Sequence, residues 1–120
     1  MELTSDWVKL VNEWVECLRL TDWDIKAAIN CKPEEMSEMG VAGCVDYNEV
    51  CKAARIELID PQYYGNRIVP LDLEKTLIHE LLHLKLSLIA DNVDELQERY
   101  VHQIIDDLAK ALVKAKRMNR

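Results

Sequence analysis

Residues 76–84 read TLIHELLHL, and this stretch is the most informative part of the 120-residue chain. Apolar residues stand before, between and after His79 and His83, so the stretch predicts an α-helix that is buried on several sides. Residues four apart on an α-helix differ by about 40° in direction and about 6 Å in height. His79 and His83 are therefore expected to direct their imidazoles toward one point, with Glu80 beside them.

The sequence on either side of this helix alternates between helix and strand patterns. Asp72 is the expected N-cap of the helix, because its carboxylate can accept hydrogen bonds from the first turn. Together the patterns indicate one α+β domain over residues 1–120. The predicted order is a helix over residues 5–20, strands over 23–29, 41–47 and 53–59, the histidine-bearing helix, a break at 90–92 and a last helix over 93–116.

Composition and charge narrow the classes of function. Apolar residues make up 49% and charged residues 31% of the chain, as is usual for globular domains. The formal net charge is −7 and the pI about 4.9, which argues against binding to nucleic acids or to anionic membranes. Residues 1–6 lack the pattern of a secretory signal, and no apolar run reaches the ~18 residues of a membrane span. We therefore expect a cytoplasmic protein.

The paired histidines and the glutamate between them suit a catalytic zinc site. His79 and His83 would bind Zn²⁺, and Glu80 would take a proton from the metal-bound water. Such a site needs a third protein ligand, which the last predicted helix can supply from Glu98 or His102. Glu98 stands on the apolar stripe of that helix, so we expect it to point partly inward, where a metal would offset the cost of its burial. Glu98 is the predicted third ligand, and His102 is the alternative.

This pattern resembles the zincin metallopeptidases, and more narrowly the small prophage-type, SprT-like or gluzincin-like proteins with a minimal catalytic domain. The similarity covers roughly residues 23–112 and includes the strand opened by Trp23, the strand at 53–58 and the motif from His79 to His83. No Gly-x-x-His continuation follows His83, which argues against a metzincin. The resemblance implies a zincin-like fold with an N-terminal helix, a three-stranded mainly antiparallel sheet, an active-site helix and a C-terminal helix.

The resemblance also implies a binding site for an extended peptide along one edge of the sheet. The peptide would add as a further strand and gain affinity from main-chain hydrogen bonds, with side-chain pockets giving specificity. Either residues 41–47 or residues 53–59 can form this edge, and the sequence does not choose between them.

The expected function is that of a zinc-dependent metallopeptidase that hydrolyses peptide bonds of a cytoplasmic protein, with Zn²⁺ as cofactor and a protein or peptide as substrate. The alternative is a non-catalytic metal-binding or protein-interaction module of zincin-like fold. In a third interpretation, the last helix, residues 93–120, serves mainly as a dimer or partner surface. The sequence leaves the oligomeric state open.

Overall fold

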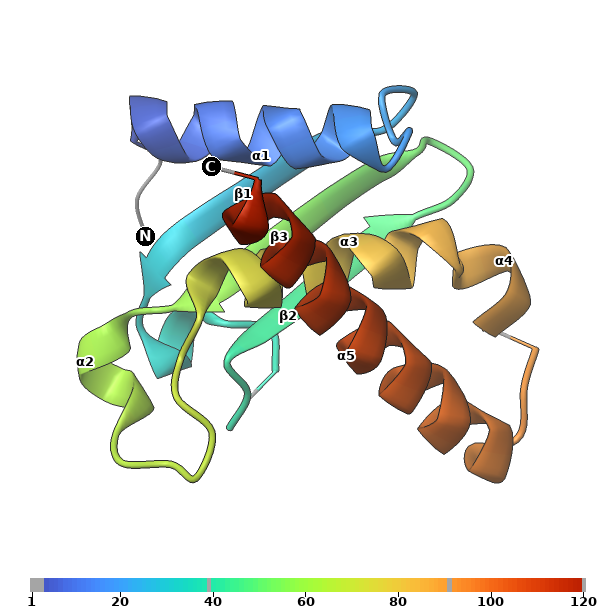
Figure 1. Cartoon of the computed structure of the whole chain (residues 1–120). Coiled ribbons are helices and arrows are strands. Elements are labelled where there is room, and N and C mark those ends of the chain that lie inside the picture. Colours follow the sequence, from blue (N-terminus) through green and yellow to red (C-terminus); the bar gives the residue numbers. More distant parts are fainter. Residues whose placement is uncertain (1–3, 39, 91, 120) are drawn as a thin grey trace.

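A computed structural model of the chain describes residues 4–38, 40–90 and 92–119, so Asp91 in the predicted break lies outside the described residues. Each predicted helix and strand has a counterpart, although the first helix ends earlier than expected because Arg19 has a φ of 57°. No helix in these ranges combines the length and the hydropathy that a bilayer span requires. The elements are α1 (Ser5–Cys17), β1 (Asp24–Cys31), the 3₁₀ turn η1 (Pro33–Glu35), β2 (Gly43–Asn48), β3 (Ala53–Ile59), α2 (Pro61–Tyr64), α3 (Leu73–Lys85), α4 (Ser87–Ala90) and α5 (Glu95–Met118) (Figure 1).

The α+β class is confirmed, but the sheet is mixed, so the prediction of a mainly antiparallel sheet is wrong. The strand order is β1-β3-β2; β3 runs parallel to β1 and antiparallel to β2. In the β2–β3 hairpin it is therefore the second strand, β3, that forms hydrogen bonds with β1. Side chains of β3 are buried on both faces of the sheet, as with Ile56 on one face and Ile59 on the other. A strand that is buried on both faces is favoured in the interior of a sheet.

The strand order also decides which of the two candidate strands is an edge. β3 is hydrogen-bonded on both sides, so residues 53–59 do not form an edge. β2 pairs only with β3 among the described strands, and it contacts α3. The edge strand beside the histidine-bearing helix is therefore β2.

Two hydrophobic clusters lie on opposite faces of the sheet. On one face α1 and α3 pack against the strands, and α5 crosses over α3 (Figure 1). The fully buried residues of this larger cluster include Ile56 and Leu58 of β3, Leu77 and Leu81 of α3, and Ile105 of α5. The smaller cluster on the other face is Ala28, Cys31, Met36, Cys44 and Ile59.

The segment between β1 and β2 is fixed to the second face of the sheet by a buried carboxylate. Glu57 of β3 accepts hydrogen bonds from the backbone N–H of Ser37 at 3.1 Å and from its hydroxyl at 2.7 Å. The Cys44 thiol is 3.7 Å from the same oxygen. A buried carboxylate needs such donors to offset its desolvation. The hydrogen bonds to Glu57 therefore fix Ser37, which precedes β2 in the chain, against the sheet.

Charged side chains fix the C-terminal half of α5 to the start of α3. Arg117 donates to both carboxylate oxygens of Asp72, at 2.8 and 3.0 Å. Glu74 accepts from Lys116 Nζ at 2.5 Å and from Trp14 Nε1 at 2.8 Å. Burial alone would raise the pKa of Glu74, but these hydrogen bonds outweigh it and the pKa lies below its ordinary value. These contacts of Arg117 and Lys116 fix the position of α5 along α3, and so determine which residues of α5 lie next to His79 and His83.

A glycine permits the close approach of β2 to α3. A Cβ atom at Gly43 would lie 2.7 Å from Leu58 Cδ2 and 2.7 Å from Thr76 Cγ2. Neither side chain moves aside easily, because Leu58 is fully buried and the branched Thr76 is held in the first turn of α3 by its hydroxyl, which donates to Asp72 O at 2.8 Å.

We expect Gly43→Ala to lower the free energy of unfolding by about 1–3 kcal/mol, because it overpacks this contact. Urea denaturation of the two proteins measures the difference. The double variant Gly43→Ala with Thr76→Ser removes one of the two opposing methyl groups and should recover part of the loss. If Gly43→Ala is as stable as wild type, Leu58 and Thr76 can make room for the added Cβ atom and the contact is not tightly packed.

Candidate metal centre

Three histidines converge between α3 and α5. His79 and His83 lie one turn apart on α3, and their ring centroids are 5.0 Å apart. His102 of α5 stands against both, with centroid distances of 4.6 Å to His83 and 6.3 Å to His79. One nitrogen of each of the three rings lies within 4.8 Å of the others, a spacing that one metal ion can bridge.

Glu98, the predicted third ligand, lies beside this cluster and not in it. Its carboxylate is 3.9 Å from His102 Nε2, and its side chain is 63% exposed, so it does not point inward as expected. His102, the alternative ligand, is the residue that α5 brings to the histidine pair. The arrangement of the described residues therefore favours a three-histidine set over one with Glu98.

The position of α5 along α3 explains this outcome. The connection between the two helices contains the short helix α4, and α5 begins only at Glu95, after the N-cap Asp94. Glu98 consequently sits in the first turn of α5, and the side chains of both Glu98 and His102 are exposed, at 63% and 51%. His102, one turn further on, is the first polar side chain of α5 to reach the histidine pair.

Glu80 is buried next to the three histidines and has one oxygen without a partner. The residue is 6% exposed, and its Oε2 accepts no hydrogen bond. Burial raises the pKa of Glu80 to about 7, and the negative charge of Glu38 adds to this effect. A cation in the site would favour the ionised carboxylate and so compensate its burial.

Two of the histidines are poised to act as ligands at neutral pH. Burial lowers the pKa of His83 to about 4, and the neighbouring His79 and His102 contribute to this shift. Burial also lowers the pKa of His79, although Asp106 opposes the effect. Both imidazoles are therefore neutral at pH 7, and each keeps a lone pair for a metal.

Asp106 lies beside His79 and was not predicted from the sequence. Its Oδ1 lies 3.6 Å from His79 Nδ1 and 3.6 Å from Lys75 Nζ, and its Oδ2 lies 2.8 Å from Lys110 Nζ. A carboxylate at Nδ1 favours the tautomer whose Nε2 is free to bind a metal. The signal was present in the sequence, because Asp106 follows His102 by four residues and so shares its face of α5.

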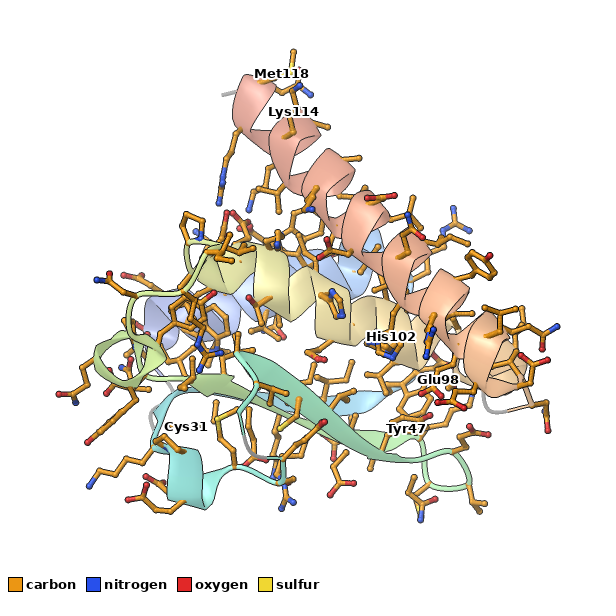
Figure 2. The ribbon with its side chains drawn as sticks, turned by 90° about the horizontal axis from the view of Figure 1, so that it is seen from below. Cys31, Tyr47, Glu98, His102, Lys114 and Met118 are labelled. Atoms are coloured by element: carbon orange, nitrogen blue, oxygen red, sulfur yellow. The ribbon has the colours of Figure 1, made fainter. Side chains whose placement is uncertain are left out.

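The three histidines open into a cleft of about 580 Å³. β2 and the segment before it form one wall, while α3 and the N-terminal half of α5 form the other. Figure 2 shows Glu98 and His102 on the part of α5 that lies near Tyr47 of β2, and all three residues line the cleft. Glu38 and Arg67 line it as well; both come from segments between regular elements, where sequence periodicity gives no signal.

Comparison with protein-family models, curated proteins and solved structures gives no match for this chain. The resemblance to zincins is therefore one of sequence pattern alone, which these comparisons do not test.

Proposed function

We propose that this chain is a zinc-dependent peptide hydrolase in which His79, His83 and His102 bind the metal and Glu80 is the general base. The observation that carries the proposal is the convergence of three imidazoles in an open cleft beside a buried, unpartnered carboxylate oxygen. Three protein ligands with a position left for water or substrate are typical of catalytic zinc sites, whereas structural sites have four.

The residues present fit a zinc ion. Neutral imidazole nitrogens are good ligands for zinc, although they also suit cobalt, nickel and iron. The unpartnered Oε2 of Glu80 is a further sign, because a buried carboxylate oxygen without a donor is costly unless a cation or water is near it. Asp106 beside His79 matches the common arrangement in which a carboxylate fixes a metal-binding imidazole.

Each part of the cleft has a role in this proposal. When bound, zinc would supply Lewis acidity, which lowers the pKa of water to roughly 7 and polarises a carbonyl group. Glu80 takes a proton from the attacking water and delivers it to the amine nitrogen that leaves. The burial of Glu80 keeps its carboxylate basic enough for this transfer near neutral pH.

The substrate is proposed to be an extended peptide. β2 has one edge paired with β3, and its residues Gly43, Cys44, Val45 and Tyr47 line the cleft. A peptide that adds to the other edge would run past the three histidines and would be held by main-chain hydrogen bonds. Specificity would then come from side chains at the cleft wall, such as Tyr47 and Arg67.

Cleavage of an unfolded protein and of a random peptide library tests this function. Zinc-loaded protein should produce fragments that mass spectrometry detects, chelation should stop their formation, and added zinc should restore it. His83→Ala is the matched control, because it removes one proposed ligand and leaves the β2 wall of the cleft unchanged. If fully zinc-loaded, folded protein produces no fragments and chelation unfolds it, the chain is instead a non-catalytic metal-binding module.

We expect Asp106→Asn to weaken zinc binding about 10- to 100-fold, because a neutral amide no longer fixes the imidazole of His79. Competition with a chromophoric chelator measures the affinity. Asp107→Asn makes the same chemical change one residue away, at an exposed position outside the cleft lining, and should leave zinc affinity unchanged. If the two variants bind zinc with equal affinity, Asp106 does not contribute to zinc binding.

A further inference from the structure

The side chain of Arg67 is held in place at one end of the cleft. Its Nε donates to Tyr64 O at 2.9 Å and its Nη1 to Gly40 O at 3.4 Å. The guanidinium also lies over the ring of Tyr64, 4.5 Å from the ring centroid. Tyr64 is fixed in turn, because its hydroxyl donates to Val69 O. The position of Arg67 is thus set before a ligand binds, which lowers the entropy cost of binding.

Arg67 has no acidic partner in the part of the chain that the structure describes. Its contacts there are all with neutral groups, namely two backbone carbonyls and one phenol ring. Arg55 and Arg117, by contrast, each contact a carboxylate. Within the same ranges Nη2 of Arg67 makes no hydrogen bond, and the side chain lines the cleft. Arg67 can therefore donate hydrogen bonds to a group that is bound in the cleft.

A second cation strengthens the positive charge at this end of the cleft. Lys75 of α3 lines the cleft, and it lines a second hollow together with residues 70–71, which follow Arg67 closely in the chain. Lys75 Nζ is 3.6 Å from Asp106 Oδ1, but Lys110 Nζ lies closer to Asp106, at 2.8 Å from Oδ2. One carboxylate is therefore shared by two ammonium groups, and their positive charge is only partly compensated.

The exposed acidic side chains of the cleft are placed differently. Glu98 is in the first turn of α5, and Figure 1 shows that turn and the loop after α2 on opposite sides of α3. Glu38 is nearer, but its negative charge acts on Glu80 beside the histidines, and it forms no ion pair with Arg67 among the described residues. An anionic group in the cleft is therefore favoured at the end that holds Arg67.

We propose that Arg67 binds a carboxylate of the peptide substrate and so makes the cleft selective for acidic peptides. This inference rests on the proposed function, since it assigns the substrate class of the same site. The planar guanidinium can donate to both oxygens of a carboxylate, which makes such pairs strong and specific. A side-chain carboxylate of Asp or Glu and the C-terminal carboxylate of a peptide offer the same chemistry.

The net charge of the chain makes this contact decisive for selectivity. At a formal charge of −7 the protein as a whole repels acidic peptides, so a general attraction cannot produce the preference. A preference for a carboxylate must then come from the local cations, of which Arg67 is the one without an acidic partner among the described residues.

Peptide binding tests the inference without requiring cleavage. The probes are fluorescein-labelled, C-terminally amidated octapeptides of Ala, Thr and Val with a single Glu at each position in turn, and the same set with Gln. Fluorescence anisotropy with Glu80→Gln protein supplied with zinc measures their affinities. At one position or two neighbouring ones, the Glu peptide should bind about tenfold more tightly than its Gln counterpart. A peptide without Glu but with a free C-terminus tests the terminal carboxylate as the source.

Two further variants, made in the same Glu80→Gln protein, assign the preference to Arg67. Arg67→Gln should abolish it, and Arg67→Glu should reverse it in favour of peptides with Lys at that position, which a merely unfolded protein would not do. Arg99→Gln removes an exposed arginine outside the cleft lining and should keep the preference. Equal binding of all peptides, no binding, or a preference that survives in Arg67→Gln would overturn the inference.

The same peptides separate this inference from the proposed function. If zinc-loaded wild type cleaves none of them but Glu80→Gln binds the acidic ones through Arg67, the hydrolase function is wrong and the selectivity of the cleft is confirmed. If wild type cleaves the Glu and Gln peptides with equal kcat/KM, the function stands and the role of Arg67 is refuted.

Discussion

Glu80→Gln should retain one bound zinc per chain and hydrolyse peptides about 10²- to 10⁴-fold more slowly than wild type. Glutamine has nearly the same shape as glutamate, so the packing around this buried residue is preserved. Its amide, however, cannot take a proton from water. The decisive pair of measurements is therefore the metal content and the rate of peptide cleavage on the same protein preparation.

The control for this variant is Glu34→Gln. Glu34 is an exposed carboxylate in η1 that does not line the cleft, so its loss changes the net charge without changing the site. Its rate of cleavage should equal that of wild type. If Glu80→Gln cleaves peptides as fast as wild type, another group is the base, and the assigned role of Glu80 is refuted.

Ile105→Ala should lower the free energy of unfolding by about 2–5 kcal/mol, because it leaves a cavity where α5 packs on α3. Ile105 is 0% exposed and belongs to the same cluster as Leu77 and Leu81. Natural domains are stable by only about 5–15 kcal/mol, so this single change removes a large part of the total. Urea denaturation in the presence of a chelator measures it without a contribution from metal binding.

Ile68→Ala is the matched control for this effect. It removes the same atoms from a fully exposed isoleucine and should change the stability by less than about 0.5 kcal/mol. Equal effects of the two variants would mean that α5 does not dock through Ile105. The Ile105→Ala variant should also bind zinc more weakly, since the same helix carries His102 to the site.

Local patterns in the sequence were sufficient to predict the elements and the placement of His79 and His83 on a buried helix. The apolar residues around His79 and His83 repeat with the period of a helix, and α3 extends over them as a buried helix. The alternation in residues 53–59 likewise matches β3 at both ends. Such signals depend only on neighbours within one turn or one strand, which the sequence displays directly.

Features set by contacts between distant segments were not predictable in the same way. The parallel pairing of β1 with β3 depends on which strand of the hairpin reaches β1, and no local pattern of residues 24–31 encodes this choice. Which of Glu98 and His102 lies against the histidine pair depends on one turn of helix position, which α4 and the hydrogen bonds from Arg117 to Asp72 determine. Glu98 shares a helix face with apolar residues, but this periodicity does not show at which residue of α5 that face begins to pack against the core.

The most direct test of the three-histidine centre is the zinc content of wild type, His83→Ala, His102→Ala and Glu98→Ala, each purified and then supplied with zinc. We predict one zinc per chain in wild type and in Glu98→Ala, and a loss of zinc in both histidine variants. Retention of zinc by His102→Ala together with its loss from Glu98→Ala would restore the sequence-based ligand set. Absence of zinc from the wild type would contradict the metal centre itself, and the proposed hydrolase function with it.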